Sequence, residues 1–167
     1  TSWGLLDKWA VHVGGGLTHR LSRSDALMIK ENDLSVSSPG GEPENSIPTA
    51  ISSIDLEANA KFTVIEVQDS RQAILAARAW SQSQKTRSGT EPIVILLDNM
   101  RPSECGSTGE SLKSLGLREW CILEGSGGVK REDLPSWKAV SGVDVVSSSE
   151  VNMNSGTFDF SMLIGGF

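Results

Sequence analysis

Polar side chains that could do chemistry follow nearly every strand-like apolar run in the sequence. These polar residues are Lys30, Glu66, Gln68, Asp98, Glu124, Ser126 and Ser147. Continuous Val, Ile and Leu runs are typical of parallel strands buried on both faces, and ligands of α/β barrels bind at the carboxyl ends of such strands. The sequence therefore predicts that one edge of a parallel sheet gathers an ammonium group, several carboxylates and hydroxyl groups into a single site.

The elements that would position these residues alternate between strand and helix. We expect strands at residues 26–29, 62–67, 93–97, 120–123 and 143–146, followed by a last apolar run at 158–164. The spacing of apolar residues indicates helices at 5–13, 47–59, 70–83, near Leu112 and at 134–137. The stretches 35–45 and 84–92 are rich in polar residues, Pro and Gly, and we expect loops there. The predicted fold is an α/β, incomplete parallel barrel of about six strands, since a regular α/β barrel has eight.

Composition limits the class of protein and the kind of partner. The 167 residues carry a formal net charge of −6, which suits one domain spanning 1–167 and disfavours a nucleic-acid or acidic-membrane binder. Cys105 and Cys121 do not form a disulfide framework, and no cluster of Cys and His suggests zinc. The sequence has no apolar run long enough to span a membrane and no signal peptide pattern, so we expect a cytoplasmic protein with a small-molecule ligand.

Six blocks of sequence resemble a known family when they are taken in order. The blocks are GGGLTHR at 14–20, ALMIKEN at 26–32, IEV at 65–67, LLDN at 96–99, EGSGG at 124–128 and SGVD at 141–144. Together they resemble the barrel domain of quinolinate phosphoribosyltransferase, also called carboxylating nicotinate-nucleotide pyrophosphorylase. The resemblance implies a type II phosphoribosyltransferase barrel, transfer of a phosphoribosyl group to quinolinate with loss of carbon dioxide, magnesium, and assembly into an oligomer. It also implies that the family's amino-terminal domain is absent from this chain.

One half of the implied site is a set of cations. His19, Arg20 and Lys30 match the family residues that hold the two carboxylates of quinolinate. A planar guanidinium binds a carboxylate with two hydrogen bonds, and an ammonium adds a point charge. The same residues could instead end a solvated loop and cap a strand. Seen together with the glycines at 14–16, the three cations favour binding of a small, aromatic carboxylate.

The other half of the implied site departs from the family. Glu66 is retained, but Gln68 stands where a second acid would contact metal and ribose, so magnesium binding is expected to weaken. Asp98 is the remaining candidate metal ligand, with helix capping as an equally good interpretation. Ser126 and Gly127 could offer backbone N–H groups to a phosphate, although such a turn alone is a weak signal.

The resemblance therefore leaves three functions open. The first is the family reaction itself, with Lys30, Glu66 and Asp98 as catalytic residues and with Gln68 and Asp98 still sufficient or a partner subunit completing the site. Alternatively, the protein could be an altered enzyme, such as a decarboxylase, that acts on a carboxylated metabolite without phosphoribosyl pyrophosphate. It could also be a non-catalytic protein that binds a ligand or pairs with a homologous subunit. The resemblance implies a homo-oligomer or a homologous partner subunit. The third function is also motivated by tryptophan-rich surfaces that could associate, although core packing is the better interpretation of the tryptophans.

Overall fold

A computed structural model describes residues 4–22, 25–37, 42–55, 62–140, 142–153 and 156. Its centre is a five-stranded parallel sheet in which each strand lies beside the next one in the sequence. The strands are β1 (Ala26–Ile29), β2 (Phe62–Val67), β3 (Ile93–Asp98), β4 (Cys121–Ser126) and β5 (Val145–Val146). This sequential, all-parallel order is the strand order of an α/β barrel.

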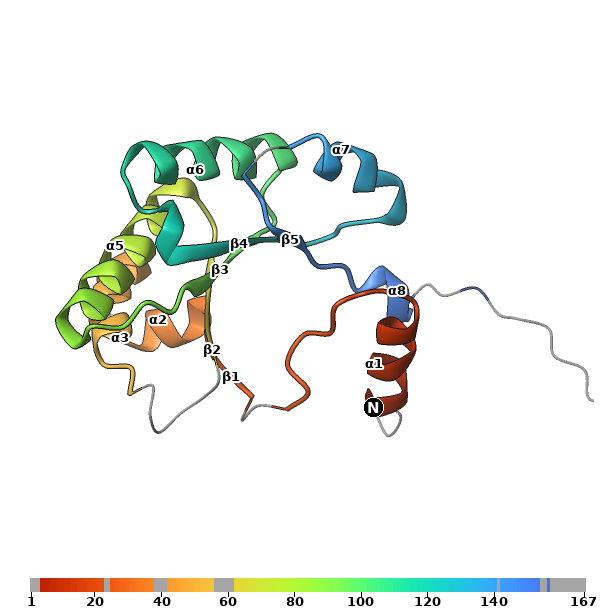
Figure 1. Cartoon of the computed structure of the whole chain (residues 1–167), viewed down its shortest axis with the longest axis horizontal. Helices are drawn as coiled ribbons and strands as arrows, with labels where there is room; N and C mark the ends of the chain where they lie inside the picture. The colour runs from red at the N-terminus through yellow and green to blue at the C-terminus, as the bar shows by residue number, and fades with distance from the viewer. Residues whose placement is uncertain are drawn as a thin grey trace, which may run out of the picture.

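The helices lie mostly on the convex side of the curved sheet (Figure 1). They are α1 (Gly4–Val13), α2 (Glu31–Ser37), α3 (Ile47–Ser52), α5 (Ser70–Arg87), α6 (Pro102–Ser114), α7 (Leu134–Lys138) and α8 (Glu150–Met153). Three 3-10 turns join them: η1 (Pro43–Ser46), η2 (Arg118–Trp120) and η3 (Arg131–Asp133). Helix α1 stands apart on the concave side and has no buried residue, with Trp9 65% exposed.

The two faces of the sheet have different surroundings. On the outer face, strand residues such as Ile65 and Leu123 pack with Trp80 of α5 into the main core. On the inner face, Val64 and Leu96 belong to a small separate cluster with Ala26 and the partly buried Met28 and Val94. Alternate side chains of a strand point to opposite faces, so this inner cluster forms the apolar floor beneath the polar residues at the strand ends.

Helix α5 begins and ends with strong local signals. Asp69 Oδ1 accepts a hydrogen bond from Gln72 N at 2.8 Å and caps the first turn. Ser88 adopts the left-handed conformation, with φ of 59°, and ends the helix. Trp80 Nε1 donates to Glu91 O at 2.7 Å, which fixes the chain where it turns into β3.

Several predicted boundaries need correction. The helix predicted at 70–83 continues to Arg87, and the strand predicted at 120–123 is Cys121–Ser126. The predicted helix 47–59 ends at Ser52, and residues 56–59 lie outside the described part of the chain. The apolar run 158–164, predicted as a sixth strand, also lies outside it.

The predicted loop 35–45 was wrong for its first residues, because α2 extends to Ser37. Asp33 Oδ2 accepts a hydrogen bond from Lys30 N at 2.8 Å, which stabilises the start of α2. Leu34 is buried, and its carbonyl accepts a hydrogen bond from Ser46 Oγ at 2.9 Å. One buried leucine and a capping carboxylate therefore outweigh the polar composition of the segment. In the part of the chain that the structure describes, no helix is long and apolar enough to cross a membrane.

Candidate functional site at the carboxyl ends of the strands

The register of the sheet aligns polar residues in a row across its inner face. Glu66 pairs with Leu96, Leu96 with Glu124, and Glu124 with Val145. Lys30 follows Ile29, the partner of Ile65, and so continues the row beside Glu66. Paired residues of neighbouring strands point to the same face, and strands lie about 4.8 Å apart. The row therefore begins with an ammonium and carries two carboxylates, separated by the side chain of Leu96.

A second row lies one step nearer the carboxyl edge. Asp98 of β3 pairs with Ser126 of β4. Continuing the register by one residue places Gln68 on one side of this pair and Ser147 on the other. The carboxyl ends of four strands thus present an amide, a carboxylate and two hydroxyl groups above the first row.

Lys30 and Glu66 form an ion pair within the first row. Lys30 Nζ lies 2.5 Å from Glu66 Oε2, and the two side chains are 50% and 17% exposed. An ammonium has three donors, and only one is used by this carboxylate. Lys30 is therefore positioned by Glu66 and retains donors for a second acceptor.

The side chain and the backbone N–H of Gln68 are both hydrogen-bonded to side chains of neighbouring helices. Its Nε2 donates to Glu31 Oε2 of α2 at 2.7 Å, and its backbone N–H donates to Gln72 Oε1 at 3.0 Å. The neutral amide of Gln68 can approach the Glu31 carboxylate closely, because it donates a hydrogen bond to it. A carboxylate at position 68 would be repelled by Glu31.

Asp98 and the glycine turn after β4 are linked through Asn99. Asn99 Nδ2 donates to Asp98 Oδ2 at 2.8 Å, and Asn99 N donates to Ser126 O at 2.9 Å. Gly127 has a φ of 97°, and a Cβ at this position would lie 2.4 Å from Asn99 Oδ1. Only glycine fits there, so the Ser126–Gly127 turn is held tightly against the end of β3.

His19 and Arg20 lie before β1, whereas Lys30 lies after it. His19 Nδ1 accepts a hydrogen bond from Arg20 N at 2.9 Å, and His19 O accepts one from Lys8 Nζ at 3.1 Å. Arg20 Nη1 donates to Ala26 O, at the start of β1, at 3.3 Å. The structure thus brings Lys30 and Glu66 together and His19 and Arg20 together, with β1 between the two pairs. The proposal that all three cations share one ligand stays a prediction.

Glu124 and Ser147 were placed at the strand-end site from the sequence, but neither was given a role in catalysis or binding. Glu124 is 6% exposed, and its Oε1 accepts a hydrogen bond from Ser147 Oγ. A buried carboxylate at the carboxyl edge is the kind of group that functional sites contain. A Glu directly after the strand predicted at 120–123 was the signal that could have identified it.

A family of known proteins matches nearly the whole chain. The model of the quinolinate phosphoribosyl transferase C-terminal domain matches residues 3–163. The chain belongs to this family. The fold prediction is thereby confirmed: the curved five-stranded sheet is consistent with the incomplete α/β barrel of its structural neighbours.

Curated relatives and solved structures agree on the family. The chain is 31% identical over 160 residues to a protein of Methanothermobacter thermautotrophicus named "Probable nicotinate-nucleotide pyrophosphorylase (carboxylating)". This match covers 96% of the chain and 51% of the relative. A protein of the same name from Archaeoglobus fulgidus is 32% identical, with 96% and 54% covered. The chain therefore spans about half the length of the curated relatives it matches.

Among solved structures, a NadC deletion mutant superposes with a TM-score of 0.74 at 26% identity, covering 95% of this chain and 48% of that chain. NadC from Streptococcus pyogenes gives a TM-score of 0.69 at 26% identity, covering 96% and 48%. The resemblance extends over nearly all of the chain.

The magnesium that the family resemblance implies does not fit a preformed site here. Among the described residues, no group of three or more His, Cys, Asp or Glu side chains is arranged to hold a metal ion. The acids of the two rows are engaged elsewhere: Glu66 with Lys30, Glu124 with Ser147, and Asp98 with the amide of Asn99. Each carboxylate keeps a second oxygen, so what the described residues lack for a hard cation is a converging group of three acids.

The segment after β5 places an acid beside the glycine turn of this family member. Glu150 Oε2 accepts a hydrogen bond from Arg131 N, and Ser148 Oγ donates to Val129 O. These bonds join the residues after β5 to the residues after Gly128. A carboxylate therefore occupies a backbone N–H group close to the turn that was predicted to hold a phosphate.

Proposed function

We propose that this chain is a phosphoribosyltransferase-like protein that binds a small aromatic carboxylate at the carboxyl edge of its sheet. The observation that carries the proposal is the position of Lys30, whose ammonium is held at the head of the inner row by Glu66. Half of the Lys30 side chain remains exposed, so its free donors can bind a carboxylate from solution.

Arg20 and His19 supply the second carboxylate contact in this proposal. The Arg20 guanidinium uses one donor on Ala26 O and keeps the others, and His19 lies directly beside it in the chain. A ligand with two carboxylates, such as quinolinate, would draw these residues toward Lys30. The relatives named as nicotinate-nucleotide pyrophosphorylases support this ligand class.

The metal and phosphoribosyl pyrophosphate end of the site is degenerate in this proposal. Gln68 supplies no charge to a divalent cation, and its amide is bonded to Glu31. Glu150 adds negative charge beside the glycine turn, where it would repel a phosphate. We therefore expect the protein to bind the carboxylate ligand more strongly than the phosphoribosyl donor.

Thermal denaturation with separate ligands tests this proposal. A ligand at 100 times its Kd stabilises the folded state by about 2.7 kcal/mol. For a chain of this size that corresponds to a rise in Tm of about 5–10 °C. We expect quinolinate or nicotinate to produce such a rise, and phosphoribosyl pyrophosphate with magnesium to produce much less.

Two variants connect the rise in Tm to the site. Lys30→Ala and Arg20→Ala are expected to abolish the effect of the carboxylates, whereas Lys113→Ala on the exposed face of α6 is expected to preserve it. A large shift with the pyrophosphate donor and magnesium would show that the donor site is intact. If neither quinolinate nor nicotinate raises the Tm, the proposed ligand class is rejected and a non-catalytic protein is favoured.

A further inference from the structure

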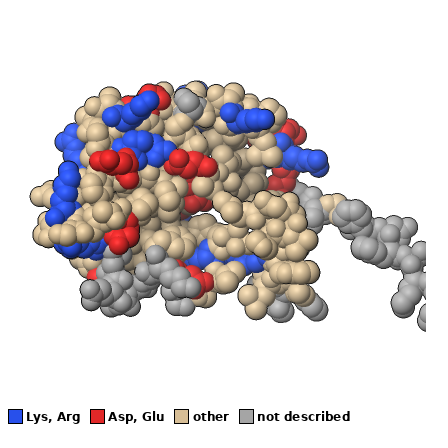
Figure 2. All heavy atoms as spheres, viewed as in Figure 1, with Lys and Arg blue, Asp and Glu red and all other residues tan. Residues whose placement is uncertain are grey.

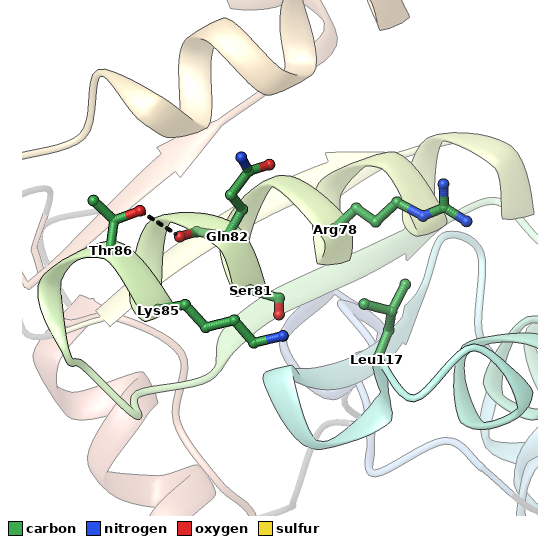
Figure 3. A pocket seen from close by; sticks show the side chains of 6 residues that line it. All are labelled: Arg78, Ser81, Gln82, Lys85, Thr86 and Leu117. Carbon is green, nitrogen blue, oxygen red and sulfur yellow. Dashed lines mark hydrogen bonds between the residues drawn. The ribbon is translucent and has the colours of Figure 1, made fainter.

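A hollow beside α5 is separate from the site at the strand ends. It has a volume of about 440 Å³, within the range of about 300–1,000 Å³ that is common for ligand pockets. Its lining consists of Arg78, Ser81, Gln82, Lys85, Thr86 and Leu117 (Figure 3). Five of these residues belong to α5, from its middle to its last turn, and the sixth directly precedes η2.

The position of this α5 hollow in the fold makes it a distinct site. Helix α5 leads into the amino end of β3, and η2 leads into the amino end of β4. The rows that contain Lys30 and Asp98 lie at the opposite, carboxyl ends of the strands. A ligand in the α5 hollow would therefore not touch the residues proposed to bind the aromatic carboxylate.

Ser81 adds a hydroxyl group to the lining of the hollow. The residue is 3% exposed, and its hydroxyl points into the hollow beside Lys85 (Figure 3). Among the described residues it has no hydrogen-bond partner. The adjacent hydroxyl of Thr86, by contrast, donates to Gln82 O at 2.9 Å. The Ser81 oxygen is not among the fully buried side-chain atoms that lack a partner, so it is open to the hollow, where a ligand oxygen can accept its hydrogen bond.

Two cations accompany the Ser81 hydroxyl. Lys85 Nζ lies 5.6 Å from the centre of the Trp120 ring, a cation–π contact that holds the ammonium over the hollow. Arg78 lies seven residues earlier, or about 10.5 Å along the helix axis. Within the described chain neither residue forms an ion pair, and no acidic residue lines the hollow. Lys and Arg side chains gather at the edge of the molecule that α5 forms (Figure 2).

Helix stability explains only part of this arrangement. Lys85 lies in the last turn of α5, where a cation interacts favourably with the helix dipole. Arg78 lies in the middle of the helix, where the dipole has little effect. The helix dipole therefore does not explain why Arg78 and Lys85 line the same hollow.

We propose that the α5 hollow binds the oxyanion group, carboxylate or phosphate, of a small molecule. Lys85 and Ser81 hold the oxyanion, Arg78 adds charge at the other end of the hollow, and Leu117 contacts an apolar part of the ligand. In a protein of net charge −6, this local excess of positive charge selects an anion over a neutral molecule. The inference does not depend on the proposed function.

An NMR titration of the whole chain tests this inference. Inorganic phosphate and citrate are added separately in a zwitterionic buffer, with NaCl holding the ionic strength constant. We expect saturable shifts of the Ser81 and Lys85 amide signals with at least one of the anions. Lys85→Gln should weaken the affinity by about tenfold, the loss of one charged hydrogen bond, and Ser81→Ala by about threefold.

Matched variants separate a specific site from general attraction. Lys113→Gln makes the same charge change on α6 and is expected to leave the affinity within about twofold. Lys30→Ala should also leave it unchanged, so failure of one proposal would not imply failure of the other. The inference would be overturned by shifts that never saturate, by equal weakening in Lys113→Gln, or by binding of poly-glutamate with no response to either small anion.

Discussion

The ion pair between Lys30 and Glu66 yields two opposite predictions for carboxylate binding. If Lys30 binds the ligand, Lys30→Met removes a charged hydrogen bond worth about 1.5–3 kcal/mol, which lowers the affinity for quinolinate by about 10- to 100-fold. Glu66→Gln removes the competing carboxylate that lies 2.5 Å from the ammonium. This second change should raise the affinity.

The size of the second effect follows from the exposure of the pair. Side chains that are 50% and 17% exposed form an ion pair worth about 0.5–1 kcal/mol after screening by solvent. The ligand no longer competes with this interaction in Glu66→Gln, so its affinity should rise by about two- to fivefold. The free energy of unfolding should fall by no more than about 1 kcal/mol in either variant.

Calorimetric titration with quinolinate and urea denaturation measure the two quantities on the same proteins. Lys113→Met serves as the control, because it removes a lysine charge from an exposed position on α6. Unchanged affinity in Lys30→Met would refute the role assigned to this ammonium. Weaker binding in Glu66→Gln than in Lys30→Met would show that the carboxylate, and not the ammonium, contacts the ligand.

Three further predictions concern the supporting structure. Gly125→Ala should lower the free energy of unfolding in urea by about 1–3 kcal/mol, because its Cβ would lie 2.3 Å from the Trp137 ring. Burial raises the pKa of the Cys105 and Cys121 thiols to about 11, so both should resist iodoacetamide at pH 8 until urea is added. Since their unfolded pKa lies near 9, unfolding should release protons between pH 9 and 11 and the folded state should lose stability there. Gln68→Glu should lower the Tm in EDTA by placing a second carboxylate at the start of α2, and millimolar magnesium should reverse the loss.

Each of these outcomes has a contrary result. Gly156→Ala places a Cβ in open space, so an equal loss in this control would show that the Trp137 contact is not the cause. Rapid alkylation of the native protein at pH 8 would contradict the burial of the thiols. A loss in Gln68→Glu that magnesium cannot reverse would indicate that the added acid does not reach a metal.

Much of the sheet was predictable because parallel strands have a simple pattern. The runs at 62–67 and 93–97 are continuous and β-branched, so their positions follow from burial on both faces. Segment 35–37 was not predictable from composition, because its helix depends on burial of Leu34 and on a carbonyl contact with Ser46. Such tertiary contacts override the local preference of polar residues.

The sequence predicted which strand ends form the candidate site, but it did not predict which side chains bond to one another there. Strand ends identify Lys30, Glu66 and Asp98 as neighbours at one edge, since register follows once the strands are known. That Gln68 bonds to Glu31 depends on the path of α2, which no motif encodes. The hydrogen bond that Glu124 accepts from Ser147 likewise depends on where the chain runs after β5; a strand was predicted at 143–146, but the structure has it only at Val145–Val146.

The apolar side chain of Leu96 divides the inner row into unequal halves. Toward β1 the row holds an ammonium together with a carboxylate, and toward β5 it holds a carboxylate that is sheltered from water. An asymmetric molecule lying across this sheet would therefore encounter a polarity gradient, and its electron-rich end would turn toward β1. The sheet alone would therefore orient a molecule bound across it.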